Sequence, residues 1–160
     1  MITETDLVHL RRCVALANEA LIAGDKPFGS VLVSENGKVL FEDRNRTITL
    51  SDPTYHPEIS IAKWAAQNLS ESERKNAVVY TSGEHCAMCS AAHGWVGLGR
   101  IVYVSSSEQL GKWLSDLGIP AGPIKAIPIT QVINDFQVEG PVAELDDQVR
   151  KLQYQFYAGK

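Results

Sequence analysis

The spacing of apolar residues changes several times along the chain, and each change marks an expected element. Apolar side chains recur every three or four residues over residues 7–21, which predicts an amphipathic helix that begins after Thr3. Two short runs rich in Val and Leu, residues 28–34 and 38–43, flank the dipeptide Asn36-Gly37. This dipeptide is typical of a two-stranded hairpin turn. The chain is therefore expected to open with a helix and a β-hairpin.

Helical and strand-like patterns alternate through the rest of the chain. They predict helices over residues 56–69, 86–98, 108–117 and from about residue 141, and strands over residues 76–81, 101–105 and 124–129. A strand, a helix and a strand in succession form a crossover, so the last two strands should be parallel. With the hairpin, these elements predict an α/β protein with a mixed sheet.

One long polar segment interrupts this pattern between the hairpin and the second helix. Residues 44–55 are polar and contain Ser51-Asp52-Pro53, a sequence that favours turns. We expect this loop to run over the surface and to line a site. Asn45 lies at its start and, taken alone, fits an asparagine that ends a strand in a turn.

Composition fits a soluble globular protein with one domain over residues 1–160. Apolar residues make up 44% of the chain and charged residues 21%. No apolar run approaches the roughly 20 residues that a membrane span requires. The N-terminus lacks a basic and apolar leader, and three cysteines do not suggest a disulfide framework. We therefore expect a cytoplasmic protein without a membrane partner.

The charge balance bears on the choice of partner. The formal net charge is -4, the isoelectric point is near 5.5, and neither end carries a block of Lys or Arg. Nucleic-acid binding depends largely on cations that neutralise phosphates. The composition therefore favours a small-molecule substrate over RNA or DNA.

The strongest chemical signal is a set of possible metal ligands. Cys86 and Cys89 are three residues apart at the start of a predicted helix, so both thiols can bind one metal ion. The same spacing also occurs in thiol redox proteins. His56 can supply a third ligand, and three protein ligands leave one position for water, as in catalytic zinc sites. Glu58 can enter the same site as the base that takes a proton from that water.

Two other classes compete with an enzyme at this point. A non-catalytic zinc-binding domain would use the metal only to hold the fold, and a redox protein would use only Cys86 and Cys89. Neither gives a role to Glu58, a free carboxylate two residues from His56. The residue pattern therefore favours catalysis.

The order of these motifs resembles the zinc-dependent cytidine and nucleobase deaminase superfamily. The resemblance lies in the motifs His56-x-Glu58 and Cys86-x-x-Cys89. They are preceded by residues 26–33, Asn45-Arg46 and residues 51–54. This order is similar to that of the guanine deaminase and tRNA adenosine deaminase branch. The resemblance covers about residues 7–129. Two residues depart from it: Pro57 replaces the usual alanine, and His85 replaces the usual proline.

The resemblance implies a three-layer α/β/α cytidine-deaminase-like fold with a five-stranded mixed sheet in which strands 4 and 5 are parallel. It implies one Zn²⁺ on His56, Cys86 and Cys89, catalysis by Glu58, and a homodimer. It further implies hydrolytic release of ammonia from a nucleobase, with tRNA adenosine deamination as the alternative within the branch. From the acidic charge we expect a free amino-oxo base of the guanine, isocytosine or cytosine type.

The resemblance also assigns residues to the substrate. Asn45 matches the position that holds the base, and Phe28 and Trp95 match aromatic positions around it. Without the resemblance, Phe28 and Trp95 would be interpreted as core residues. His85 is the expected specificity residue, since relatives carry proline beside the metal.

Overall fold

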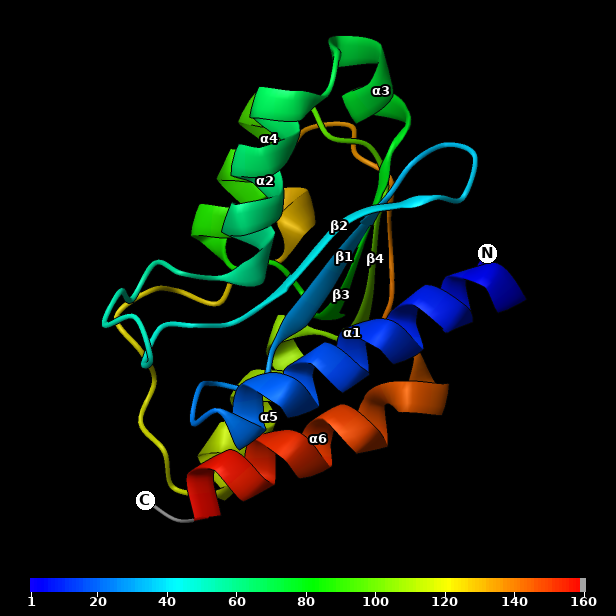
Figure 1. The fold of residues 1–160 in the computed structure, drawn as a ribbon. Helices are drawn as coiled ribbons and strands as arrows, with labels where there is room; N and C mark the ends of the chain where they lie inside the picture. The colour runs from blue at the N-terminus through cyan, green and yellow to red at the C-terminus, as the bar shows by residue number, and fades with distance from the viewer. Residues whose placement is uncertain (159–160) are drawn as a thin grey trace.

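The computed structural model describes residues 1–158 and places a five-stranded sheet between two layers of helices (Figure 1). The strands lie in the order β2-β1-β3-β4-β5. They are β1 (Gly29–Val33), β2 (Val39–Arg44), β3 (Val78–Gly83), β4 (Ile101–Ser105) and β5 (Val138–Glu139). β1 is antiparallel to β2 and β3, whereas β3, β4 and β5 are mutually parallel. The predicted mixed sheet with parallel strands 4 and 5 is confirmed.

The helices divide between the two faces of the sheet. They are α1 (Glu4–Ile22), α2 (Pro57–Asn68), α3 (Glu71–Asn76), α4 (Ala87–Val96), α5 (Ser107–Asp116) and α6 (Ala143–Ala158). α1 and α6 lie side by side on one face with α5 beside α6, while α2 and α4 pack together on the other (Figure 1). The predicted three-layer α/β/α arrangement is confirmed.

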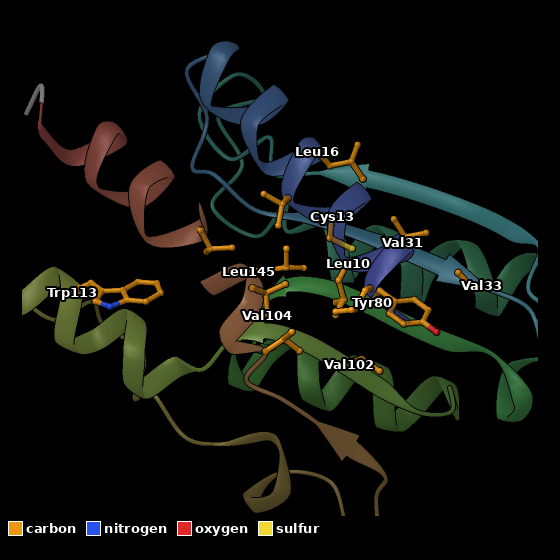
Figure 2. Close-up of a cluster of buried hydrophobic side chains, with 14 residues drawn as sticks. Leu10, Cys13, Leu16, Val31, Val33, Tyr80, Val102, Val104, Trp113 and Leu145 are labelled. Carbon is orange, nitrogen blue, oxygen red and sulfur yellow. The ribbon is translucent and has the colours of Figure 1, made fainter. Parts of the chain in front are cut away.

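Each face of the sheet has its own apolar core. Between the sheet and the layer of α1, α5 and α6, buried side chains come from these three helices or their ends and from β1, β3 and β4, and include Leu10, Val31, Val104 and Leu145 (Figure 2). Under α2 and α4 a second cluster includes Leu32. All five residues of β1 are buried because successive side chains of this central strand enter opposite cores.

The prediction of a strand over residues 124–129 is wrong. In the structure the strand that follows β4 is β5, and Ile129–Gln131 forms a short 3-10 helix. Prolines at positions 120, 123 and 128 lack the amide N–H that a sheet needs, and Ile124 is 65% exposed. The apolar residues of this segment therefore do not form a ladder.

The helix α3 was not predicted from the sequence. Ser70 caps this helix and exchanges hydrogen bonds with Glu73 in a capping box. None of its residues is buried, so it lacks the apolar periodicity that marks the longer helices. Across residues 1–158, no helix has both the length and the apolar character that would let it cross a bilayer.

Candidate active site

The expected metal ligands lie at the start of two helices that meet beside the end of β3. His56 is the N-cap residue of α2 and Cys86 is the N-cap residue of α4. Neither side chain caps its own helix, so both are available to bind a metal. Pro57 occupies the first turn of α2, where its missing N–H costs nothing. The departure from the family pattern at Pro57 is thus compatible with the helix.

The three ligand atoms already have the spacing of a zinc site. The Nδ1 atom of His56 is 3.7 Å from Cys86 Sγ and 3.4 Å from Cys89 Sγ, and the two sulfurs are 3.5 Å apart. A tetrahedral zinc with Zn–S bonds of about 2.3 Å and a Zn–N bond of about 2.0 Å would hold these atoms roughly 3.5–3.8 Å apart. Since this trio of donors fits, His56, Cys86 and Cys89 would hold the metal.

Electrostatics in the site favour a thiolate ligand. The hydrogen bond with Cys89, followed by that with His56, lowers the pKa of Cys86 to about 4. The partial positive charge at the start of α4 acts in the same direction. The bond to Cys86 in turn raises the pKa of His56. The bond to Cys86 and then burial raise the pKa of Cys89. One of the two sulfurs, that of Cys86, is therefore favoured as a thiolate before a cation binds.

Glu58 lies against the ligands without joining them. It is 6% exposed, and its Oε2 atom is 3.7 Å from Cys89 Sγ. Its Oε1 atom accepts hydrogen bonds from the hydroxyls of Thr81 at 2.8 Å and Ser30 at 3.2 Å. Burial raises the pKa of Glu58, against the opposing effects of His56 and Thr81. A carboxyl group held in this way, with its pKa raised, is suited to accept and return a proton.

Sequence reasoning missed the two hydroxyls that hold Glu58. Ser30 and Thr81 are paired across β1 and β3, and both side chains are fully buried. A hydroxyl inside an otherwise apolar strand needs a buried partner, so it could have signalled a polar group on the covering helix. That this polar group is Glu58 could not be predicted, because it depends on how α2 packs on the sheet.

Two of the expected substrate residues, Asn45 and Phe28, lie together, and Asn45 is 1% exposed. The backbone N–H of Asn45 donates to the carbonyl of Phe28 at 3.0 Å. The Phe28 ring packs over Gly83 at the end of β3, where a Cβ atom would lie 3.0 Å from the ring. The N–H of Arg46 donates to the carbonyl of Tyr55, which keeps Asn45 close to the metal ligand that follows Tyr55.

The other two substrate candidates differ sharply in burial, and one of them, His85, directly precedes the ligand Cys86. His85 is 1% exposed, its ring meets the His93 ring edge-on at 5.4 Å, and its Nδ1 atom has no hydrogen-bond partner among residues 1–158. Its role in specificity stays a prediction. Trp95 is 91% exposed in the last turn of α4, roughly 13 Å along the helix from Cys86. The alternative interpretation of Trp95 as a core residue is wrong.

Comparison with known proteins identifies the family. Residues 3–105 match the model of the cytidine and deoxycytidylate deaminase zinc-binding region. The chain belongs to this family. It is thus a zinc-binding deaminase, and deaminases of this family hydrolyse carbon–nitrogen bonds. The prediction of zinc as the cofactor is confirmed by the family and by the three adjacent ligand atoms.

Individual relatives of this deaminase differ in substrate. It is 34% identical over 111 residues to a Schizosaccharomyces pombe protein named "Probable cytosine deaminase", covering 69% of this chain and 67% of that protein. It is 32% identical over 109 residues to the tRNA-specific adenosine deaminase of Haemophilus influenzae, covering 68% and 63%. It is 35% identical over 97 residues to the guanine deaminase of Bacillus subtilis, covering 60% and 62%. The matches therefore span about two thirds or less of these relatives' lengths.

Solved structures show the same fold. A guanine deaminase from Nitrosomonas europaea superposes with a TM-score of 0.72 at 18% identity, covering 99% of this chain and 86% of that one. A structure from a study of tRNA:A34 deaminases, which edit the wobble position of transfer RNA, gives a TM-score of 0.62 at 22% identity, covering 91% and 99%. The fold is thus common to deaminases with different substrates.

Proposed function

We propose that this deaminase releases ammonia from a free amino-oxo nucleobase of the guanine, isocytosine or cytosine type. The observation that carries the proposal is Glu58, a buried carboxyl group whose Oε2 atom lies beside three ligand atoms with the spacing of a zinc site. A metal site with a purely structural purpose has no need of such a group. This geometry supports acid–base catalysis next to the metal.

Glu58 carries the proton transfers of the proposed reaction. When bound, zinc supplies a water of lowered pKa and stabilises negative charge that develops nearby. The Oε2 atom of Glu58 is placed to accept a proton from the attacking water and to deliver it to the ring nitrogen beside the carbon under attack. Glu58 would then take the remaining proton from the hydroxyl group added to that carbon and pass it to the amino group. Ammonia would leave as the carbonyl forms. The hydroxyls on Oε1 keep Oε2 aimed at the metal ligands throughout.

Binding of the base would use Asn45 and Phe28, which the proposal places at the mouth of the site. The Oδ1 atom of Asn45 already accepts hydrogen bonds from the N–H and the hydroxyl of Thr47, so its Nδ2 group remains to donate to the base. Phe28 offers an aromatic ring for apolar contact with a planar ligand. Uncapped N–H groups at the start of α4 are suitable donors to the developing oxyanion.

The charges around this mouth favour a small base over a nucleic acid. Arg44 and Arg46 flank Asn45, but Arg44 is paired with Asp25 at 2.9 Å and Arg46 with Asp43 at 3.1 Å. These guanidinium groups are therefore already neutralised within the chain. With a net charge of -4, the protein offers little to a polyanion.

The second candidate function is deamination of adenosine in tRNA, which several relatives perform according to their names. One assay separates the two candidates: ammonia release from a panel of free bases, nucleosides and a tRNA anticodon stem, each at low and high salt. We expect turnover of a free amino-oxo base with little dependence on salt. Efficient deamination of the tRNA stem that weakens steeply with salt, without turnover of any free base, would overturn the proposal.

We further propose that the deaminase forms a homodimer through α4. Residues 86–99 contain no Asp, Glu, Lys or Arg, although the side chain of Trp95 stands in solvent. An uncharged helix with a solvent-exposed tryptophan is typical of an interface. In such a dimer Trp95 would serve the interface, and a role toward the base would require the partner copy.

A further inference from the structure

The loop between β2 and α2 joins two residues of the active site, and its conformation has to be held by something other than regular structure. Asn45 lies at one end and His56 follows the other end. Turns fill the segment between them, and Ser51 has a positive φ of 51°. Such a loop is ordered only if side chains satisfy its free backbone groups.

Besides the loop's own turns, one buried carboxylate anchors its first half. Asp25, directly after α1, has an exposure of 0%. Its Oδ1 atom accepts from the N–H groups of Ile48 at 2.9 Å and Thr49 at 2.8 Å. Its Oδ2 atom accepts from the Thr49 hydroxyl at 2.8 Å and from Arg44 Nη1 at 2.9 Å. Although burial opposes the charge, these bonds together lower the pKa of Asp25.

The same network reaches the asparagine at the site. The Nη1 atom of Arg44 donates to the carbonyl of Asn45 at 3.0 Å as well as to Asp25. The N–H of Asn45 is held by Phe28, and its Oδ1 atom by Thr47. Asn45 is therefore fixed at three groups, and two of the bonds depend on the loop that Asp25 anchors.

We propose that Asp25 is a positioning residue that sets the affinity for the base by holding Asn45 in its binding orientation. Asp25 itself touches neither the metal ligands nor the mouth, so it acts through Arg44 and the backbone of the loop. This inference rests on the proposed function, since it assumes that Asn45 contacts the substrate. It predicts that loss of the carboxylate weakens substrate binding while the chemistry at Glu58 is retained.

The chain offers a matched control in Asp6. This carboxylate is also buried, at 2% exposed, and accepts hydrogen bonds from Arg100 and Tyr80. It lies in the first turn of α1, about 24 Å along the helix from Ile22, whereas Asp25 lies three residues beyond Ile22. Asp6→Ala should therefore lower stability by a comparable amount without disturbing the loop.

Steady-state kinetics on the base that the wild type deaminates best, with Asp25→Ala, Asp25→Asn and Asp6→Ala, test the inference. We expect Asp25→Ala to raise KM roughly tenfold or more while kcat stays within about threefold of wild type. This pattern is expected when a mutation weakens the binding of the substrate and of the transition state equally. Asp25→Asn can retain the bonds to Ile48 and Thr49 but not the pairing with Arg44, so its KM should be intermediate. Asp6→Ala should leave KM unchanged. A KM that rises equally in Asp6→Ala and Asp25→Ala would make Asp25 only a structural residue.

A double-mutant cycle with Asn45→Ala tests whether Asp25 acts through Asn45. If it does, Asp25→Ala should change KM by less than about twofold once Asn45 is already replaced. Two independent, additive effects would overturn the inference.

Hydrogen exchange at the amides of Ile48 and Thr49 gives a readout that does not depend on activity. Both amides should lose protection by roughly tenfold or more in Asp25→Ala and keep it in Asp6→Ala. Unchanged protection in Asp25→Ala contradicts the inference even if the wild type deaminates free bases. If Asp25→Ala loses this protection but the wild type deaminates no free base, the proposed function is rejected instead.

Discussion

At the scale of single residues, the active site depends on which oxygen of Glu58 is occupied. Ser30 and Thr81 hold Oε1, and Oε2 faces the sulfur of Cys89. Burial disfavours the charged form and raises the pKa of Glu58, while His56 and the Thr81 hydroxyl oppose that rise. One group can therefore both accept and donate a proton during the reaction.

Replacing Glu58 by Gln should abolish nearly all turnover. Gln keeps the size of the side chain and can still meet the two hydroxyls, but it cannot carry a proton between water and base. We expect kcat to fall by about 100 to 10,000-fold or more. Metal analysis should still find one zinc per chain. Loss of zinc in Glu58→Gln would mean that Glu58 is a ligand, and activity near wild type would exclude the proton transfer.

A second residue, His93, should make stability depend on pH. It is 1% exposed, burial lowers its pKa to about 4, and its Nε2 atom is 2.8 Å from the carbonyl of Gly99. Its pKa in the unfolded chain is about 6.5, so between about pH 6.5 and 4 the unfolded state binds the extra proton and the folded state does not. Stability should therefore fall as the pH falls, by about 2 kcal/mol between pH 7 and 5.

Urea unfolding of wild type and His93→Gln at both pH values measures this effect. Gln can still donate to Gly99 but does not titrate, so its loss of stability on acidification should be smaller by about that amount. Taking the difference removes the contribution of zinc release, which is common to both proteins. Parallel pH profiles for the two proteins would contradict the assignment.

The residues of the site could be predicted from sequence to the extent that they stand in one local motif. His56, Glu58, Cys86 and Cys89 are recognisable because their spacing reflects coordination chemistry at two helix starts. Ser30, Thr81 and Asp25 act across the sheet or between a helix end and a loop, and their partners are distant in sequence. Long-range pairs of this kind leave no periodic signal in a single sequence.

At the scale of elements, the contact between α1 and β1 decides how closely the layer of α1, α5 and α6 approaches the sheet. Gly29, the first residue of β1, faces the backbone of α1. A Cβ atom there would lie 2.4 Å from Leu16 Cβ, 2.6 Å from the carbonyl oxygen of Cys13 and 2.8 Å from Ala17 N. Two of these three neighbours are backbone atoms, which cannot move aside without shifting the helix.

Gly29→Ala should therefore destabilise the fold by about 3 kcal/mol, since the added methyl group forces α1 away from the sheet. Gly111, within α5, is the control: it is exposed and a Cβ atom there would meet nothing within 4 Å. Gly111→Ala should raise stability by roughly 0.5–1 kcal/mol, as expected for alanine in a helix interior. Chemical denaturation of both variants measures the difference, and similar effects at the two positions would contradict this description of the contact.

The expected elements agree with the structure where apolar periodicity and packing coincide. α1 begins directly after Thr3, which caps it together with Asp6, and β4 has the predicted bounds. The prediction of a strand over residues 124–129 failed because prolines precede this segment and interrupt it at Pro128. The true edge strand β5 has two residues, too few for any alternation to be visible.

At the scale of the whole molecule, the layer of α2 and α4 carries the exposed apolar surface of the proposed dimer. Trp95→Glu places a charge where the partner copy would pack, so we expect sedimentation to show a dimer for wild type and a monomer for this variant. Val8→Glu is the control, because Val8 is 60% exposed on α1 in the opposite layer. A wild-type monomer, or a Trp95→Glu dimer of unchanged affinity, would exclude this interface.

The loop anchored by Asp25 also bears on how new substrate preferences could arise. Its base is closed by the bond from Arg46 N–H to the Tyr55 carbonyl, while Leu50 at its tip is 53% exposed. Lengthening a loop whose ends are already joined costs little free energy, because closure entropy grows slowly with length. The tip can thus diversify by insertion or replacement while zinc binding and folding stay intact. In this architecture we expect evolvability to belong to the exposed tip around Leu50, which is separate in the chain from the metal ligands and Glu58.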